Sequence, residues 1–93
     1  YPAEIENLML AHDTVGQVAV VGTPDDRLGE VGVAFVVPAA GATVDPDELV
    51  AWSKETMANY KAPRRVVVLD ELPMNVAGNK VDREALKAQA AAT

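Results

Sequence analysis

The sequence predicts an α+β fold, in which a small three-stranded sheet, made of one antiparallel hairpin plus a third strand, is covered by helices. Two observations indicate this class. Two β-rich runs follow each other closely, and a third comes only after a segment with helical signals. The chain has 93 residues, of which 49% are hydrophobic, and this is enough for one modest core in a single domain over 1–93.

The predicted strands are short and are bounded by turn-forming residues. The first covers 15–21 and is followed by a turn cluster, and the second covers 30–37 and ends before Pro38. We expect these two strands to pair as an antiparallel hairpin with an irregular loop at about 23–29. A third strand is predicted at 66–69.

Three segments carry helix signals. The first covers about 2–10, with a proline at its start and acidic residues in its first turn. The second covers about 46–58, where Asp45 is the expected N-cap and Glu48 completes a capping box. The last covers about 82–90, and we expect the alanine-rich tail of the chain to fray.

Composition and charge exclude several classes of function. A net charge of −6 argues against a general nucleic-acid binder. Without cysteine, the chain can form neither a disulfide nor a thiolate metal site. No apolar run approaches the roughly 20 residues that span a bilayer. Turn and cap roles account for four aspartates, so no metal site is predicted at Asp25, Asp26, Asp45 and Asp47.

Several short motifs follow one another in a characteristic order. They are 1–6 (YPAEIE), 19–25 (AVVGTPD), 29–30 (GE), 34–38 (AFVVP), 60–65 (YKAPRR), 72–73 (LP) and 78–81 (GNKV). Together they resemble the C-terminal domain of the adenylate-forming enzymes, a superfamily that contains acyl-CoA synthetases, nonribosomal-peptide adenylation domains and beetle luciferases. The resemblance covers about residues 1–87.

The resemblance implies a two-step ligase in a longer protein. A carboxylic acid first attacks the α-phosphate of ATP, giving an acyl-adenylate and pyrophosphate, and the thiol of coenzyme A then displaces AMP. A large N-terminal domain, absent from this chain, would hold most of the ATP, its Mg²⁺ and the acid, and the small domain would swing between two orientations. The isolated chain is therefore expected to be inactive. The resemblance also implies a cytoplasmic enzyme of fatty-acid or related metabolism.

Lys80 matches the loop lysine that the family brings to the adenylation site. A fixed ammonium there could bridge the carboxylate, the phosphate and the leaving pyrophosphate. In the family, glycine is followed directly by this lysine, whereas here Asn79 intervenes and Lys80 falls seven residues after Pro73. We interpret Asn79 as a one-residue insertion that takes the left-handed conformation otherwise supplied by glycine. The alternative for Lys80 is a solvated loop lysine.

A basic segment follows the second helix. In the CoA-bound orientation of the family, this segment lies near the nucleotide part of coenzyme A. The resemblance therefore implies that Lys54, Lys61 and Arg64 bind its phosphates and that Tyr60 lies against its adenine. Some members carry a cation where Ala62 stands, so one contact is expected to be missing. A solvated basic turn is an equally good interpretation.

Gly29 and Glu30 occupy the position of a Gly-Glu pair that the family retains beside the domain interface. Both are candidates for lining the CoA tunnel. The alternative interpretation, a structural turn followed by an exposed acid, has the stronger local support.

Three functions stay open at this point. The first is the C-terminal domain of an acyl-CoA synthetase, with a carboxylic acid as the small-molecule substrate and with ATP, CoA and the N-terminal domain as partners. The second is the corresponding part of a nonribosomal-peptide adenylation domain, whose final motif often reads as residues 80–86 do here (KVDREAL). The third is a binding or regulatory module of the same fold without ligase activity.

Overall fold

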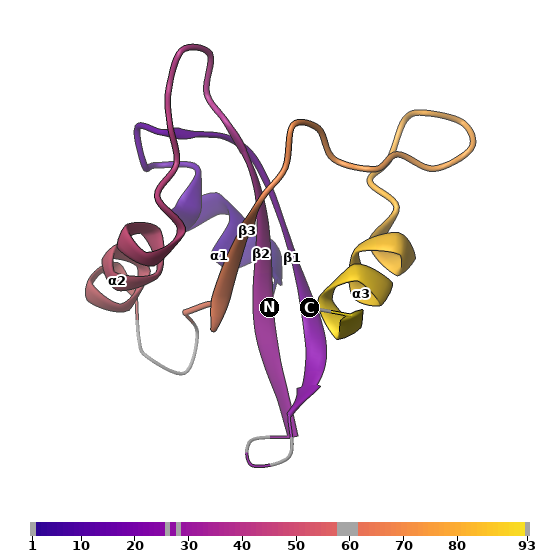
Figure 1. The fold of residues 1–93 in the computed structure, drawn as a ribbon, viewed down its shortest axis with the longest axis horizontal. Helices are drawn as coiled ribbons and strands as arrows, with labels where there is room; N and C mark the ends of the chain where they lie inside the picture. The colour runs from indigo at the N-terminus through magenta and orange to yellow at the C-terminus, as the bar shows by residue number, and fades with distance from the viewer. Residues whose placement is uncertain (1, 26, 28, 58–61, 93) are drawn as a thin grey trace.

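The computed structural model describes residues 2–25, 27, 29–57 and 62–92. Figure 1 shows a sheet flanked on both sides by helices. In chain order the elements are α1 (Pro2–Met9), β1 (Val15–Asp25), β2 (Gly29–Pro38), α2 (Pro46–Thr56), β3 (Arg65–Val68) and α3 (Arg83–Ala92). This order confirms the predicted sequence of helices and strands.

The three strands form one mixed sheet in the order β1-β2-β3. β1 and β2 are antiparallel, with Val20 opposite Ala34, and this confirms the predicted hairpin. β3 runs parallel to β2, with Phe35 opposite Val67. A parallel neighbour requires a crossover connection, and the segment containing α2 provides it. The α+β class is therefore confirmed.

The core has two parts because β2 is buried on both faces. Ala34 and Val36 face a cluster that includes Met9 of α1 and Leu49 of α2. Val33 and Phe35 face a second cluster, which α3 completes with Leu86 and Ala90. Alternating side chains thus supply both layers, as expected for a central strand. Figure 1 shows α1 and α2 on one side of the sheet and α3 on the other.

The hairpin is longer than predicted, and the prediction of an irregular loop at 23–29 is wrong. Pairing continues through Thr23 opposite Val31 to Asp25 opposite Gly29. A proline at position 24 suggested a turn, but β1 is an edge strand. A proline is tolerated there because its missing N–H removes no ladder bond when that side of the strand is unpaired.

The last helix is also longer than predicted. α3 continues to Ala92 instead of ending near residue 90. Ala90 is 2% exposed, and its carbonyl accepts a hydrogen bond from Arg65 Nη2 at 2.9 Å. Packing against the sheet and this contact hold a segment that would fray in isolation.

Local capping explains where α2 begins. Asp45 Oδ1 accepts hydrogen bonds from the backbone N–H groups of Asp47 (3.1 Å) and Glu48 (3.3 Å), so the predicted N-cap is confirmed. The helix ends at Thr56, two residues earlier than predicted, with Met57 as its C-cap. α1 ends one residue earlier than predicted, and both boundaries of β2 and of β3 differ from the prediction by one residue. No helix in the described ranges is long and apolar enough to cross a membrane.

Candidate functional site

Lys80 stands at the end of a small closed loop between β3 and α3, which projects from the body of the domain in Figure 1. Met74 and Val81 form an isolated antiparallel bridge at the loop's base. Next to it, the Asn75 N–H donates to the Lys80 carbonyl at 2.8 Å. Backbone hydrogen bonds therefore fix the position of Lys80 even though the residue is exposed.

The turn of this loop depends on a glycine rather than on Asn79. Gly78 has φ +74° and its N–H donates to the Asn75 carbonyl at 2.8 Å. Among the described residues no non-glycine residue has a positive φ, so the prediction that Asn79 takes the left-handed conformation is wrong. Glycine adopts this conformation without the Cβ clash that asparagine would incur. The Asn79 N–H instead reaches the Asn75 side-chain oxygen at 3.4 Å.

Lys80 borders an open hollow of about 500 Å³. The residues that line it are Asn75, Lys80, Val81, Asp82, Arg83 and Glu84, all of them polar or charged except Val81. Within the described part of the chain, no ion pair or side-chain hydrogen bond engages the Lys80 ammonium. An ammonium group whose backbone is fixed by hydrogen bonds, and which makes no ion pair with a described residue, is available to bind an anionic ligand.

The loop leads directly into α3, and Asp82 joins the two. The Asp82 side chain accepts from the Ala85 N–H at 3.1 Å and caps the helix, as the sequence indicates. Its own N–H donates to the Pro73 carbonyl at 2.8 Å. Sequence reasoning missed the next residue, Arg83, whose guanidinium contacts Glu6 on α1. No local pattern could have revealed a contact between residues 77 positions apart.

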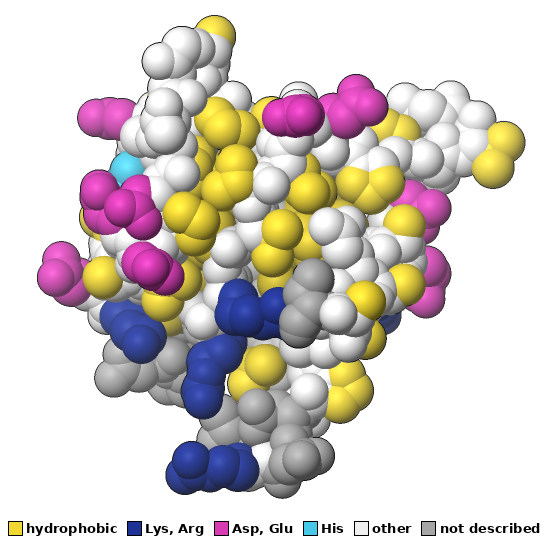
Figure 2. All heavy atoms as spheres, viewed as in Figure 1, with side chains coloured by type: hydrophobic (Ala, Val, Ile, Leu, Met, Phe, Trp, Pro, Cys, Tyr) yellow, Lys and Arg dark blue, Asp and Glu magenta, His cyan; other side chains and the backbone are white. Residues whose placement is uncertain are grey.

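Two of the predicted CoA-phosphate residues, Lys54 and Arg64, belong to the described part of the chain. Figure 2 shows Lys and Arg side chains in the lower half of one face, over the end of α2, the start of β3 and the hairpin tip, with acidic side chains mainly above. Lys54 lies in the last turn of α2, and Arg64 precedes β3. Both side chains are exposed. Tyr60 and Lys61, which were predicted to join them, lie outside the described residues.

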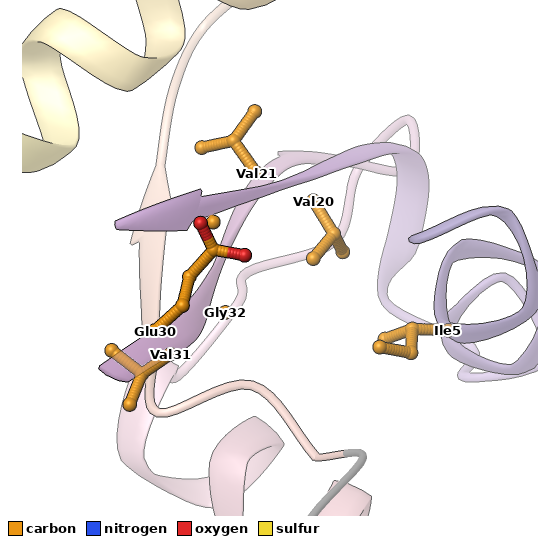
Figure 3. Close-up of a pocket in the computed structure, with 7 residues that line it drawn as sticks. Ile5, Val20, Val21, Glu30, Val31 and Gly32 are labelled. Atoms are coloured by element: carbon orange, nitrogen blue, oxygen red, sulfur yellow. The ribbon is translucent and has the colours of Figure 1, made fainter. Parts of the chain in front are cut away.

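Glu30 lines a second hollow, of about 170 Å³, at the N-terminal part of β2. Figure 3 shows its carboxylate extended over the sheet between otherwise apolar neighbours. The hollow is lined by Ile5, Val20, Val21, Gly22, Glu30, Val31 and Gly32. A Cβ at Gly22 would lie 2.4 Å from the Glu30 carboxyl carbon, so a glycine at 22 makes room for this carboxylate. Gly29 begins β2 with φ +83° and does not line the hollow.

The structure places the candidate residues on different elements. The Lys80 loop, between β3 and α3, lies at one end of the molecule, whereas the C-terminal end of α2, which carries Lys54, and the start of β3, which Arg64 precedes, lie toward the other (Figure 1). No contact within the described residues joins Lys80 to Lys54 or Arg64. In addition, no group of three or more His, Asp or Glu side chains within the described ranges is placed to hold a metal ion.

Over the residues that the structure describes, the fold and the loop define a small α+β module with a projecting lysine and with open hollows beside Lys80 and Glu30. The chain belongs to the AMP-binding enzyme C-terminal domain family, whose sequence profile matches residues 4–79. This match ends one residue before Lys80, at the Asn79 that separates the lysine from Gly78.

Relatives of known function support this assignment. The chain is 48% identical over 87 residues to 3-[(3aS,4S,7aS)-7a-methyl-1,5-dioxo-octahydro-1H-inden-4-yl]propanoyl:CoA ligase of Rhodococcus jostii (strain RHA1), with 94% of this chain and 17% of the ligase covered. It is 49% identical over 78 residues to feruloyl-CoA synthase of an Amycolatopsis species, with 84% of this chain and 16% of the synthase covered.

A solved structure gives the same result for the fold. The crystal structure of ATP-bound MatB from Rhodopseudomonas palustris superposes with a TM-score of 0.86 and 35% identity, covering 96% of this chain and 18% of MatB. The chain therefore spans less than a fifth of the length of the proteins that it matches.

Proposed function

We propose that this chain is the C-terminal domain of an ATP-dependent acyl-CoA synthetase. Membership of the AMP-binding enzyme C-terminal domain family supports this function, and so do the names of the two relatives, a CoA ligase and an acyl-CoA synthase. The observation that carries it is the Lys80 loop, whose backbone is closed by hydrogen bonds and whose ammonium has no partner within the described residues. The nonribosomal-peptide alternative has no comparable support among these relatives.

In the proposed first step, a carboxylate oxygen attacks the α-phosphorus of ATP. A P–O bond forms to the acid, and the bond to pyrophosphate breaks. Negative charges converge in this step, so a positioned ammonium stabilises the transition state more than the separated reactants. Lys80 supplies that charge, while the ATP, its Mg²⁺ and the acid are bound mainly by the N-terminal domain of the same protein.

In the proposed second step, the sulfur of coenzyme A attacks the acyl carbon, and AMP leaves. Lys54 and Arg64 bind the CoA phosphates, and the hollow beside Glu30 borders the path of the CoA arm. Because these residues belong to α2, β2 and the start of β3, whereas the Lys80 loop lies between β3 and α3, we infer that the domain presents a different side in each step. Such a reorientation is a conformational gate between the two half-reactions.

The acid remains to be identified by assay. The names of both relatives specify acids that carry a ring, a bicyclic propanoate and ferulate. We therefore propose to test the full-length enzyme with ring-bearing and straight-chain carboxylic acids, measuring AMP release in the presence of ATP and CoA. Release that requires both an acid and CoA supports the function. Acid-dependent AMP release that is indifferent to CoA, or no release with any acid, contradicts it.

The isolated 93-residue chain is expected to release no AMP from ATP with any acid. It contains the lysine but neither a phosphate-binding loop nor an enclosed acid pocket among its described residues. Mixing the chain with ATP, acid and CoA and separating the nucleotides by chromatography checks this. Turnover by the chain alone would mean that a complete site lies within these residues.

Replacing Arg64 with alanine in the full-length enzyme is expected to raise the KM for CoA by about three- to tenfold, the usual effect of losing one charge-assisted contact to phosphate. Adenylate formation, measured by pyrophosphate exchange without CoA, should stay unchanged. Lys87→Ala is the matched control, because Lys87 is an exposed cation on α3 that pairs only weakly with Glu84 at 3.8 Å. An equal rise in both variants would indicate a general charge effect.

A further inference from the structure

Side chains satisfy backbone groups on the outer edge of β1. This strand ends the sheet on one side, because the strand order is β1-β2-β3. At Val20 the backbone N–H donates to Glu6 Oε2 at 2.7 Å, and the backbone carbonyl accepts from Arg83 Nη1 at 3.0 Å. Glu6 and Arg83 thus bond both groups that a further strand would otherwise pair with. We call Glu6, Val20 and Arg83 the edge clamp.

The two charged members of the edge clamp also bind each other. Arg83 Nη1 lies 3.0 Å from Glu6 Oε2, and Arg83 Nη2 lies 3.4 Å from Glu6 Oε1, so the ion pair is bidentate. The Glu6 side chain is only 15% exposed, against 47% for Arg83. An isolated surface ion pair contributes little, but this one is partly shielded from water and shares its atoms with a backbone group.

The edge clamp joins the two helical layers around the side of the sheet. Glu6 belongs to α1, which packs on one face through Met9. Arg83 is the first residue of α3, which packs on the opposite face through Leu86. The contact is therefore the point at which the start of α3 is tied to both β1 and α1.

This tie lies next to the candidate catalytic loop. Arg83 follows Lys80 by three residues and lines the same hollow. The two intervening residues are themselves bonded back to the incoming arm of the loop, Val81 through its bridge to Met74 and Asp82 through Pro73. The outgoing arm can therefore shift only if the start of α3 shifts with it.

We propose that Arg83 is a positioning residue for Lys80. Through the edge clamp it holds the loop in a fixed position relative to the rest of the domain. The proposal rests on the proposed function, in which Lys80 assists adenylate formation. Arg83 itself does not touch the reacting atoms. A lysine displaced by about 1 Å loses much of its effect on the transition state, because electrostatic assistance depends on pre-arranged geometry.

The test is a double-mutant cycle in the full-length enzyme, with adenylate formation measured by pyrophosphate exchange. Arg83→Met keeps the aliphatic length but removes the clamp, and it should slow adenylation about tenfold. In a Lys80→Ala background the same change should alter the residual rate by less than about twofold, since there is no lysine left to position. Lys87→Met, which removes a cation from the same helix, is the matched control and should leave adenylation unchanged.

A second measurement reports on the local stability of the loop backbone. Amide hydrogen exchange of the peptide covering 74–82 should be faster in Arg83→Met than in the parent enzyme and unchanged in Lys87→Met. Unchanged exchange in Arg83→Met overturns the proposal. So does a tenfold loss that persists in the Lys80→Ala background, which would mean that Arg83 acts on substrate or on folding. If Lys80→Ala alone leaves adenylation intact, the proposed role of the lysine fails first, and the two failures are thereby distinguished.

Discussion

Replacing Lys80 with alanine in the full-length enzyme is expected to slow adenylate formation by about 10²- to 10³-fold, the usual loss when one pre-arranged charge-stabilising group is removed from a transition state. Thioester formation from preformed acyl-adenylate and CoA should change little, because we propose that this step uses another side of the domain. The two half-reactions can be measured separately, by pyrophosphate exchange and by CoA-dependent release of AMP from the adenylate.

The neighbouring asparagine provides a sharp control for this prediction. Asn79 stands directly after Gly78, where the family pattern has its lysine, so an Asn79→Ala variant tests whether position 79 or position 80 matters. The Asn79 N–H contacts the Asn75 side chain through the backbone only, and alanine preserves that donor. We expect adenylation to be nearly unchanged. A larger loss in Asn79→Ala than in Lys80→Ala, or equal loss of both half-reactions in Lys80→Ala, would remove Lys80 from the mechanism.

The largest effect on stability is expected for Phe35→Ala. Phe35 is fully buried on β2 in the cluster that holds α3 to the sheet. Truncating a buried phenylalanine lowers the free energy of unfolding by about 3–5 kcal/mol, which combines lost burial with the cavity left behind. Small domains have a total stability of about 5–15 kcal/mol, so this variant should be close to unfolded at moderate temperature.

Urea denaturation of the 93-residue chain can check this value, followed by the fluorescence of Trp52, the single tryptophan. Trp52 packs against the other core cluster, on the opposite face of the sheet, so Phe35→Ala does not alter its immediate surroundings. Val68→Ala is the control, because Val68 lies on β3 and is 37% exposed. Its cost should stay below about 1 kcal/mol. Similar losses in the two variants would mean that α3 is not held by the Phe35 cluster.

Features with local causes were predicted well from the sequence. The cap at Asp45 depends on a side chain bonding amides two and three positions away, so the pattern contains both partners. The same holds for Asp82 and for the hairpin, whose strands adjoin in sequence. The catalytic role of Lys80 stays a prediction, which rests on the resemblance of the motifs around it to a family.

Features that depend on distant partners were missed. The extension of β1 through Pro24 could be predicted only if β1 was known to be an edge strand. The extension of α3 to Ala92 depends on the sheet face that buries Ala90 and on the Arg65 side chain that binds its carbonyl. The turn at Gly78 depends on Asn75, and the sequence interpretation assigned the left-handed residue one position too late.

The sequence by itself therefore determined the class of the fold, the order of its elements and the lysine to be tested. Tertiary structure decided how that lysine is held. The loop is closed at its base by the pairing of Met74 with Val81, and its exit is tied by Arg83 to Glu6, 77 residues earlier. The physical reason is that capping and strand alternation depend on residues a few positions apart. The edge clamp forms only when folding has brought α1 and α3, which pack on opposite faces of the sheet, to the same edge of β1.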